Sequence, residues 1–144
     1  MNIWAKFLIV IVVIGIPAFM AGPMIWHPSP DIAPTAGQMP FFMLLSLVES
    51  LFFGFSIAFI AFGWSLVKKA SQPGKFAKAR FAAIAWLLIS WWPLDNLHIS
   101  NGMNTQGLLY IDYGFHMTLM LAGIVLAYSF ITMMMGQYSK PAAK

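Results

Sequence analysis

Four long apolar segments limit how this chain can fold. They run over about residues 3–26, 40–67, 80–99 and 108–136. Each is near or above the roughly 20 residues that a helix needs to cross the hydrocarbon core of a bilayer. Hydrophobic residues make up 60% of the chain and charged residues 8%, whereas a soluble domain has about 45–50% and about 25%. We therefore predict an all-α integral membrane protein, a four-helix bundle that forms a single domain over residues 1–144.

The third segment contains a proline, Pro93, at which the helix can either bend or stop. Pro93 has no backbone N–H and disfavours helical geometry in the residue before it. We expect the helix either to bend at Pro93 or to stop there, with the residues that follow lying at the membrane interface. The dipeptide Asn101-Gly102 is typical of a turn and marks the end of this segment.

The first segment has a second interpretation. Lys6 near its start and the small residues before Pro23 are features of a signal peptide. In this interpretation residues 1–22 are the signal peptide and are cleaved off. The apolar run is long, however, and it continues past Pro23 to Trp26, a residue type enriched at membrane interfaces. These features favour a membrane span.

The basic residues indicate an orientation. If four segments cross the membrane, all eight basic residues fall on one side, in the N-terminal end, the 68–80 loop and the C-terminal end. They are Lys6, Lys68, Lys69, Lys75, Lys78, Arg80, Lys140 and Lys144. Because basic residues accumulate on the cytoplasmic side, we expect both termini and the 68–80 loop to be cytoplasmic. The net charge of +4 then reflects topology and attraction to anionic lipid, and we expect no nucleic-acid partner.

The acids and histidines fall on the opposite side of this topology. Residues 91–117 hold two of the four acids and two of the three histidines of the chain. Glu49, in the outer half of the second segment, completes the set. We therefore predict an outward-facing polar pocket lined by Glu49, Asp95, His98, Asp112 and His116.

Helical spacing places polar and small residues on common faces, which we expect to turn toward one another. Small residues also allow helices to approach closely in lipid. The first face belongs to segment 3–26: Gly15, Ala18 and Gly22. The second belongs to segment 40–67: Ser46, Glu49, Ser50, Gly54, Ala58 and Ala61. The third belongs to segment 108–136: Asp112, His116, Met120, Gly123 and Ala127.

The residue types in the predicted pocket are those that bind transition metals. Asp112 and His116, four residues apart, can supply two ligands from one helix, and Asp95 with His98 can supply two more. Imidazole and carboxylate suit zinc, copper, iron or manganese, and the chain has no cysteine to narrow the choice. We predict a site for a divalent or copper ion, with Glu49 as a further ligand, a hydrogen-bonding partner of a ligand or a general base.

Two other interpretations remain open. His98 and His116 could be axial ligands of a haem, although His98 lies near the end of its segment and the chain has no second histidine pair for a second haem. Alternatively, the cluster belongs to a non-enzymatic subunit or assembly factor, where it is a proton relay or a structural network in which Glu49 pairs with His116. In either case other membrane subunits or further copies of the chain are expected partners beside the lipid.

The spacing of Asp112 and His116 resembles the copper-site helix of the particulate methane and ammonia monooxygenases. That family has a further histidine about thirteen residues on, where this chain has Ser129. The resemblance covers five residues and implies a copper ligand pair at most. No phosphate-binding loop, nucleophile elbow, dinucleotide-binding glycine pattern or HExxH motif is present, so the sequence does not indicate a conventional soluble-enzyme mechanism.

Overall fold

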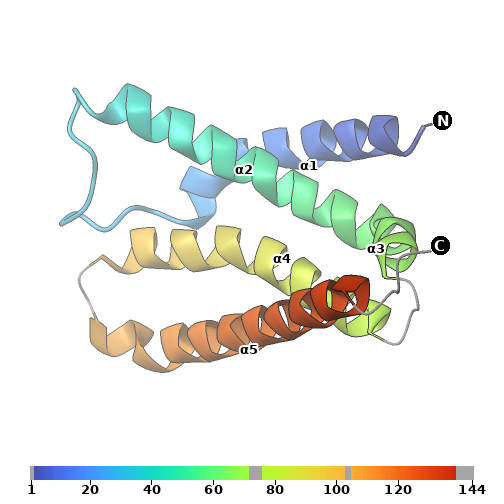
Figure 1. Cartoon of the computed structure of the whole chain (residues 1–144). Helices are drawn as coiled ribbons and strands as arrows, with labels where there is room; N and C mark the ends of the chain where they lie inside the picture. Colours follow the sequence, from blue (N-terminus) through green and yellow to red (C-terminus); the bar gives the residue numbers. More distant parts are fainter. Residues whose placement is uncertain (1, 72–75, 103–104, 139–144) are drawn as a thin grey trace, which may run out of the picture.

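The computed structural model describes residues 2–71, 76–102 and 105–138. The described chain is helical and contains no strand. Its elements are α1 (Ile3–Ile25), α2 (Met39–Phe62), α3 (Trp64–Ala70), α4 (Ala77–Asn101) and α5 (Thr105–Tyr138) (Figure 1). In Figure 1 the four long helices lie alongside one another. The start of α1 and the end of α5 lie at the same end as the short helix α3.

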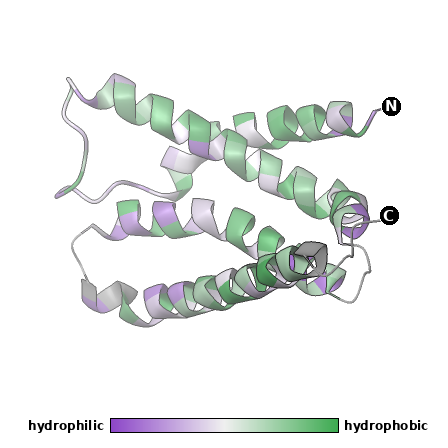
Figure 2. Ribbon diagram, in the orientation of Figure 1, coloured by the Kyte–Doolittle hydropathy of each residue, from purple (hydrophilic) through white to green (hydrophobic). Residues whose placement is uncertain are grey.

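Three of the described helices are long and apolar enough to cross a membrane: α1, α2 and residues Leu109–Met135 of α5. At 1.5 Å per residue, the 23 residues of α1 and the 24 of α2 extend about 34 and 36 Å, more than a hydrocarbon core of about 30 Å. Figure 2 shows apolar residues along the length of these helices. The chain is thus a membrane protein by the length and composition of its helices.

The helix boundaries decide between the two alternatives at Pro93 and divide the second segment. The alternative in which the helix stops at Pro93 is wrong, because α4 continues through this residue to Asn101. The expected turn is confirmed at Gly102, whose φ of 57° lies in the left-handed region that glycine adopts readily. The second segment is two helices, because α2 ends at Phe62 and α3 begins at Trp64.

The contact between α1 and α2 is the most extensive between any two helices of the described chain. A Cβ atom added to Gly54 would lie 2.6 Å from the Ile11 carbonyl oxygen, and one added to Gly15 would lie 2.9 Å from the Leu51 Cα. Both obstacles are backbone atoms, so these glycines are what allows the two helices to approach. The small-residue faces predicted for these helices therefore do pack against each other at Gly15 and Gly54.

The helix α5 packs mainly against α4, and polar side chains join the two along their length. At one end the Arg80 guanidinium donates to the Ser129 hydroxyl. Near the middle, Trp86 Nε1 donates to Thr118 Oγ1 over 3.0 Å. The face predicted for this helix around Met120 and Gly123 is not turned inward: both residues are exposed, and no atom lies within 4 Å of a Cβ built on Gly123.

Aromatic rings and one buried hydroxyl connect the α1–α2 pair to the α4–α5 pair. Ring pairs from α2 and α4 have centroids 4.6 to 5.4 Å apart: Phe53 with Trp92, Phe52 with Trp91, and Phe59 with Phe81. Among them Ser56, which is fully buried, donates to the Leu88 carbonyl over 3.0 Å. This contact between α2 and α4 brings Glu49 of one pair near Asp95 of the other.

Candidate functional site

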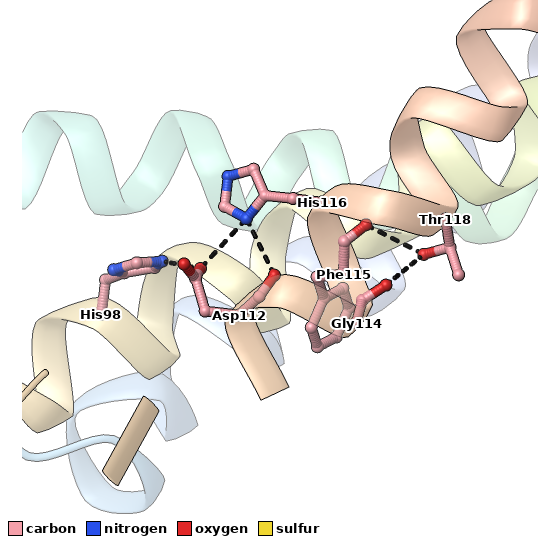
Figure 3. A network of polar contacts seen from close by, with 6 residues as sticks. All are labelled: His98, Asp112, Gly114, Phe115, His116 and Thr118. Carbon is pink, nitrogen blue, oxygen red and sulfur yellow. Dashed lines mark hydrogen bonds and ion pairs between the residues drawn. The ribbon is translucent and has the colours of Figure 1, made fainter. Parts of the chain in front are cut away.

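Three of the predicted residues meet at the end of the α4–α5 pair. His98 Nε2 lies 2.9 Å from Asp112 Oδ1, and His116 Nδ1 lies 3.2 Å from the same oxygen (Figure 3). His116 Nδ1 also lies 2.8 Å from the Asp112 backbone carbonyl oxygen. Two imidazole nitrogens, from two different helices, thus contact the same carboxylate oxygen.

The local structure explains why these three side chains meet. Asp112 and His116 are one turn apart on α5, so their side chains share a face. His98 lies in the last turn of α4, close to the connection to α5, and reaches across to Asp112. The side chains of His98 and His116 are 46% and 55% exposed and that of Asp112 is 25% exposed, so the group is open on one side.

Histidine and aspartate are residue types that bind metal ions, but the present arrangement is one of hydrogen bonds. Among the described residues, no group of three or more histidine and acidic side chains is placed to hold a metal ion. In the triad formed by His98, Asp112 and His116, the nitrogen atoms point at the carboxylate oxygen itself. Binding an ion there requires the rings to turn so that nitrogen and oxygen atoms face a common point.

The other two predicted residues form a separate pair. Glu49 of α2 and Asp95 of α4 are joined by a hydrogen bond between their side chains, and both are partly buried. A hydrogen bond between two carboxyl groups requires one of them to carry a proton. The described contacts therefore divide the predicted five-residue pocket into a histidine-containing triad and a carboxyl pair.

A small cavity lies beside the carboxyl pair, between α1, α2 and α4. Its volume is about 40 Å³, and its polar lining groups are Ser46, Glu49, Ser50, Asn96 and the indole of Trp26. The indole nitrogen of Trp26 is buried and has no hydrogen-bond partner. Apolar walls surround these groups: Phe19, Gly22, Pro23, Pro28, Phe42, Trp92 and Ile99.

The sequence pattern did not predict this cavity, and one predicted pairing is wrong. The alternative in which Glu49 pairs with His116 is wrong, since Glu49 bonds Asp95 and His116 lies against Asp112. The sequence predicts Trp26 only as an interfacial aromatic residue. The available signal was that Trp26 lies four residues after Gly22 and so shares the small-residue face of α1.

The first loop lies against the end of α4. The Ser29 backbone N–H donates to the Ile99 carbonyl oxygen over 2.9 Å, and the Ser29 hydroxyl donates to Asp31. His27 in the same loop is exposed and lies outside both the triad and the cavity lining. This histidine is a natural control for experiments on the other two.

Comparisons with known proteins add no family. The chain matches no protein-family model, no curated protein and no solved structure.

Proposed function

We propose that this protein is a four-helix membrane protein that binds a divalent transition-metal ion through His98, Asp112 and His116. The observation that carries this proposal is the approach of two imidazole nitrogens to one carboxylate oxygen, at 2.9 and 3.2 Å. Two histidines and one carboxylate form a donor set that binds iron, zinc or manganese and leaves coordination positions open.

The exposure of the triad supports this assignment. Because both rings are about half exposed, water or another small ligand can complete the coordination of an ion held there. The rings need only to turn about their side-chain bonds, because the backbones of α4 and α5 already bring the three groups together. Glu49 and Asp95 are not part of this donor set, since they bond each other.

The helix arrangement supports four crossings with both termini on one side. The start of α1 and the end of α5 lie at the same end of the structure (Figure 1), as an even number of crossings requires. The 25 residues of α4 extend about 37 Å, long enough to span with its neighbours. Lys6, Lys68, Lys78 and Arg80 belong to the end that carries the termini, so the positive-inside rule assigns that end to the cytoplasm. The metal donors then face outward.

A second candidate function is structural: the hydrogen bonds of His98, Asp112 and His116 hold α4 and α5 together. We call this arrangement a latch. It is favoured by the hydrogen bonds that the triad already makes and by the lack of a ready-made metal group among the described residues. A haem held by both histidines finds less support, because the Asp112 carboxylate lies between the two rings where the porphyrin would have to sit.

Elemental analysis tests the proposal. The full chain is purified without a histidine tag, incubated with zinc, manganese or ferrous salts, and freed of unbound ions by gel filtration. We expect about one equivalent of metal in the wild type, none in His98→Ala and His116→Ala, and an unchanged content in His27→Ala, the matched control. Visible absorption of the same samples tests for haem.

Either of two results overturns metal binding: no retained metal in the wild type, or retention that survives both triad substitutions. The latch is then tested by a double-mutant cycle of His98→Ala and Asp112→Ala in unfolding experiments. A hydrogen bond within a protein contributes about 0.5–1.5 kcal/mol, so a coupling in that range supports the latch and no coupling rejects it.

A further inference from the structure

The cavity between α1, α2 and α4 contains a donor with nothing to bond. Trp26 Nε1 is buried without a partner among the described residues, and leaving a buried donor without a hydrogen bond is unfavourable. Across the cavity lie the Glu49 carboxyl group and the Asn96 side chain, whose amide donates to the Trp92 carbonyl oxygen over 2.8 Å. The cavity therefore offers both donors and acceptors to whatever fills it.

The size of the cavity decides what it can hold. A cavity needs about 10–15 Å³ of this kind of volume for each water molecule, so about 40 Å³ accommodates roughly three or four. Sites for cofactors and drug-sized ligands occupy about 300–1,000 Å³, which rules out a quinone or a similar ring without a large rearrangement. Polar walls with an unpaired donor and acceptor groups are the surroundings in which buried water is found.

We propose that the Glu49–Asp95 pair is a proton-binding site and that water held in the cavity beneath Trp26 connects it to the end of the bundle that carries the first loop. The two carboxyl groups are hydrogen-bonded, which requires one proton between them. One water accepts from Trp26 Nε1 and donates toward Glu49. The cavity reaches Pro28 in the first loop and Ile99 near the end of α4, so its water lies next to the solvent-facing loop.

The electrostatic surroundings are consistent with a shared proton. None of the residues that line the cavity is basic. Two ionised carboxylates in contact would repel each other strongly in a region of low dielectric constant, whereas a single proton converts the repulsion into a hydrogen bond. Ionisable groups within membrane helices are costly and are usually functional. The pair shares no residue with the metal donors, so this inference stands apart from the proposed function.

Infrared spectroscopy of the full chain in lipid tests for the proton. The chain has only four acidic side chains, so a protonated carboxyl band can be assigned by substitution. At neutral pH we expect one such band in the wild type. Glu49→Gln and Asp95→Asn should each remove or shift it, the double variant should remove it, and Asp112→Asn should leave it in place. In D2O the band should shift within seconds, because the cavity water exchanges.

Nuclear magnetic resonance tests for the water. The indole N–H of Trp26, assigned with Trp26→Phe, should show a cross-peak with water. The indole N–H of Trp86 is the control, because it is bonded to Thr118 and should show none. The inference is overturned by the absence of a protonated carboxyl band in the wild type, by a band that is unchanged in the double variant, or by a Trp26 indole that has no contact with water. Circular dichroism on each variant confirms that the helices are retained.

Discussion

A methyl group at Gly54 should push α1 and α2 apart. A Cβ atom at this position would lie 2.6 Å from the Ile11 carbonyl oxygen, and ordinary contacts begin at 3.4 Å. The backbone of α1 therefore has to recede by about 0.8 Å. A gap of 0.5–1 Å loses a quarter to a half of the dispersion energy of the atoms that it separates.

The expected cost follows from the contacts along this interface. A contact between two heavy atoms contributes only about 0.1–0.2 kcal/mol, but the loss is spread over all the atoms that α1 and α2 bring together. An additional carbon atom forced into a closely packed core typically costs about 1–3 kcal/mol. Gly54→Ala should thus lower the free energy of unfolding by about 1–3 kcal/mol.

The control has to remove the effect of helix propensity, which favours alanine over glycine by about 1 kcal/mol. Gly123→Ala provides it, because Gly123 also lies within a helix and nothing surrounds its Cβ position within 4 Å. Both variants are unfolded by a denaturing detergent titration in micelles and followed by circular dichroism. Equal unfolding free energies for the two variants would refute the argument that backbone contact at Gly54 holds α1 to α2.

Two further substitutions test other contacts by the same titration. Trp86→Phe keeps the stacked ring but removes the bond to Thr118, so it should cost about 0.5–1.5 kcal/mol, and an unchanged stability would show that this bond contributes nothing. Gly102→Ala places a side chain at a positive φ and against the Asp31 carboxylate; it should cost about 1–2 kcal/mol, and a neutral result would mean that the turn can rearrange freely.

Much of the fold follows from the sequence, because the period and length of the apolar segments determine where helices form. Contacts within one helix follow as well: Asp112 and His116 are one turn apart and lie 3.2 Å from each other in the structure. Contacts between helices depend on how each helix is rotated about its axis, and side-chain packing decides that rotation. The outward rotation of Met120 on α5, which is 67% exposed, could not be read from the spacing.

The partner of Glu49 illustrates the same limit in chemical terms. A single sequence suggests that an acid pairs with a histidine or a metal ion, because opposite charges attract. In the structure Glu49 bonds a second acid, Asp95, which is stable only when a proton is shared. No residue pattern predicts such a pair, because the pair depends on the contact of α2 with α4 and on the low polarity of its surroundings.

The two proposed sites depend on different interfaces. The triad lies within the α4–α5 pair, which is also joined by Arg80 with Ser129 and by Trp86 with Thr118, so it should persist even when that pair moves relative to α1 and α2. The Glu49–Asp95 pair and the cavity exist only where the two helix pairs meet, at an interface of aromatic rings and the bond from Ser56 to Leu88. A change that loosens this interface should separate Glu49 from Asp95, so that each carboxyl group loses its partner. His98, Asp112 and His116 on α4 and α5 should stay together.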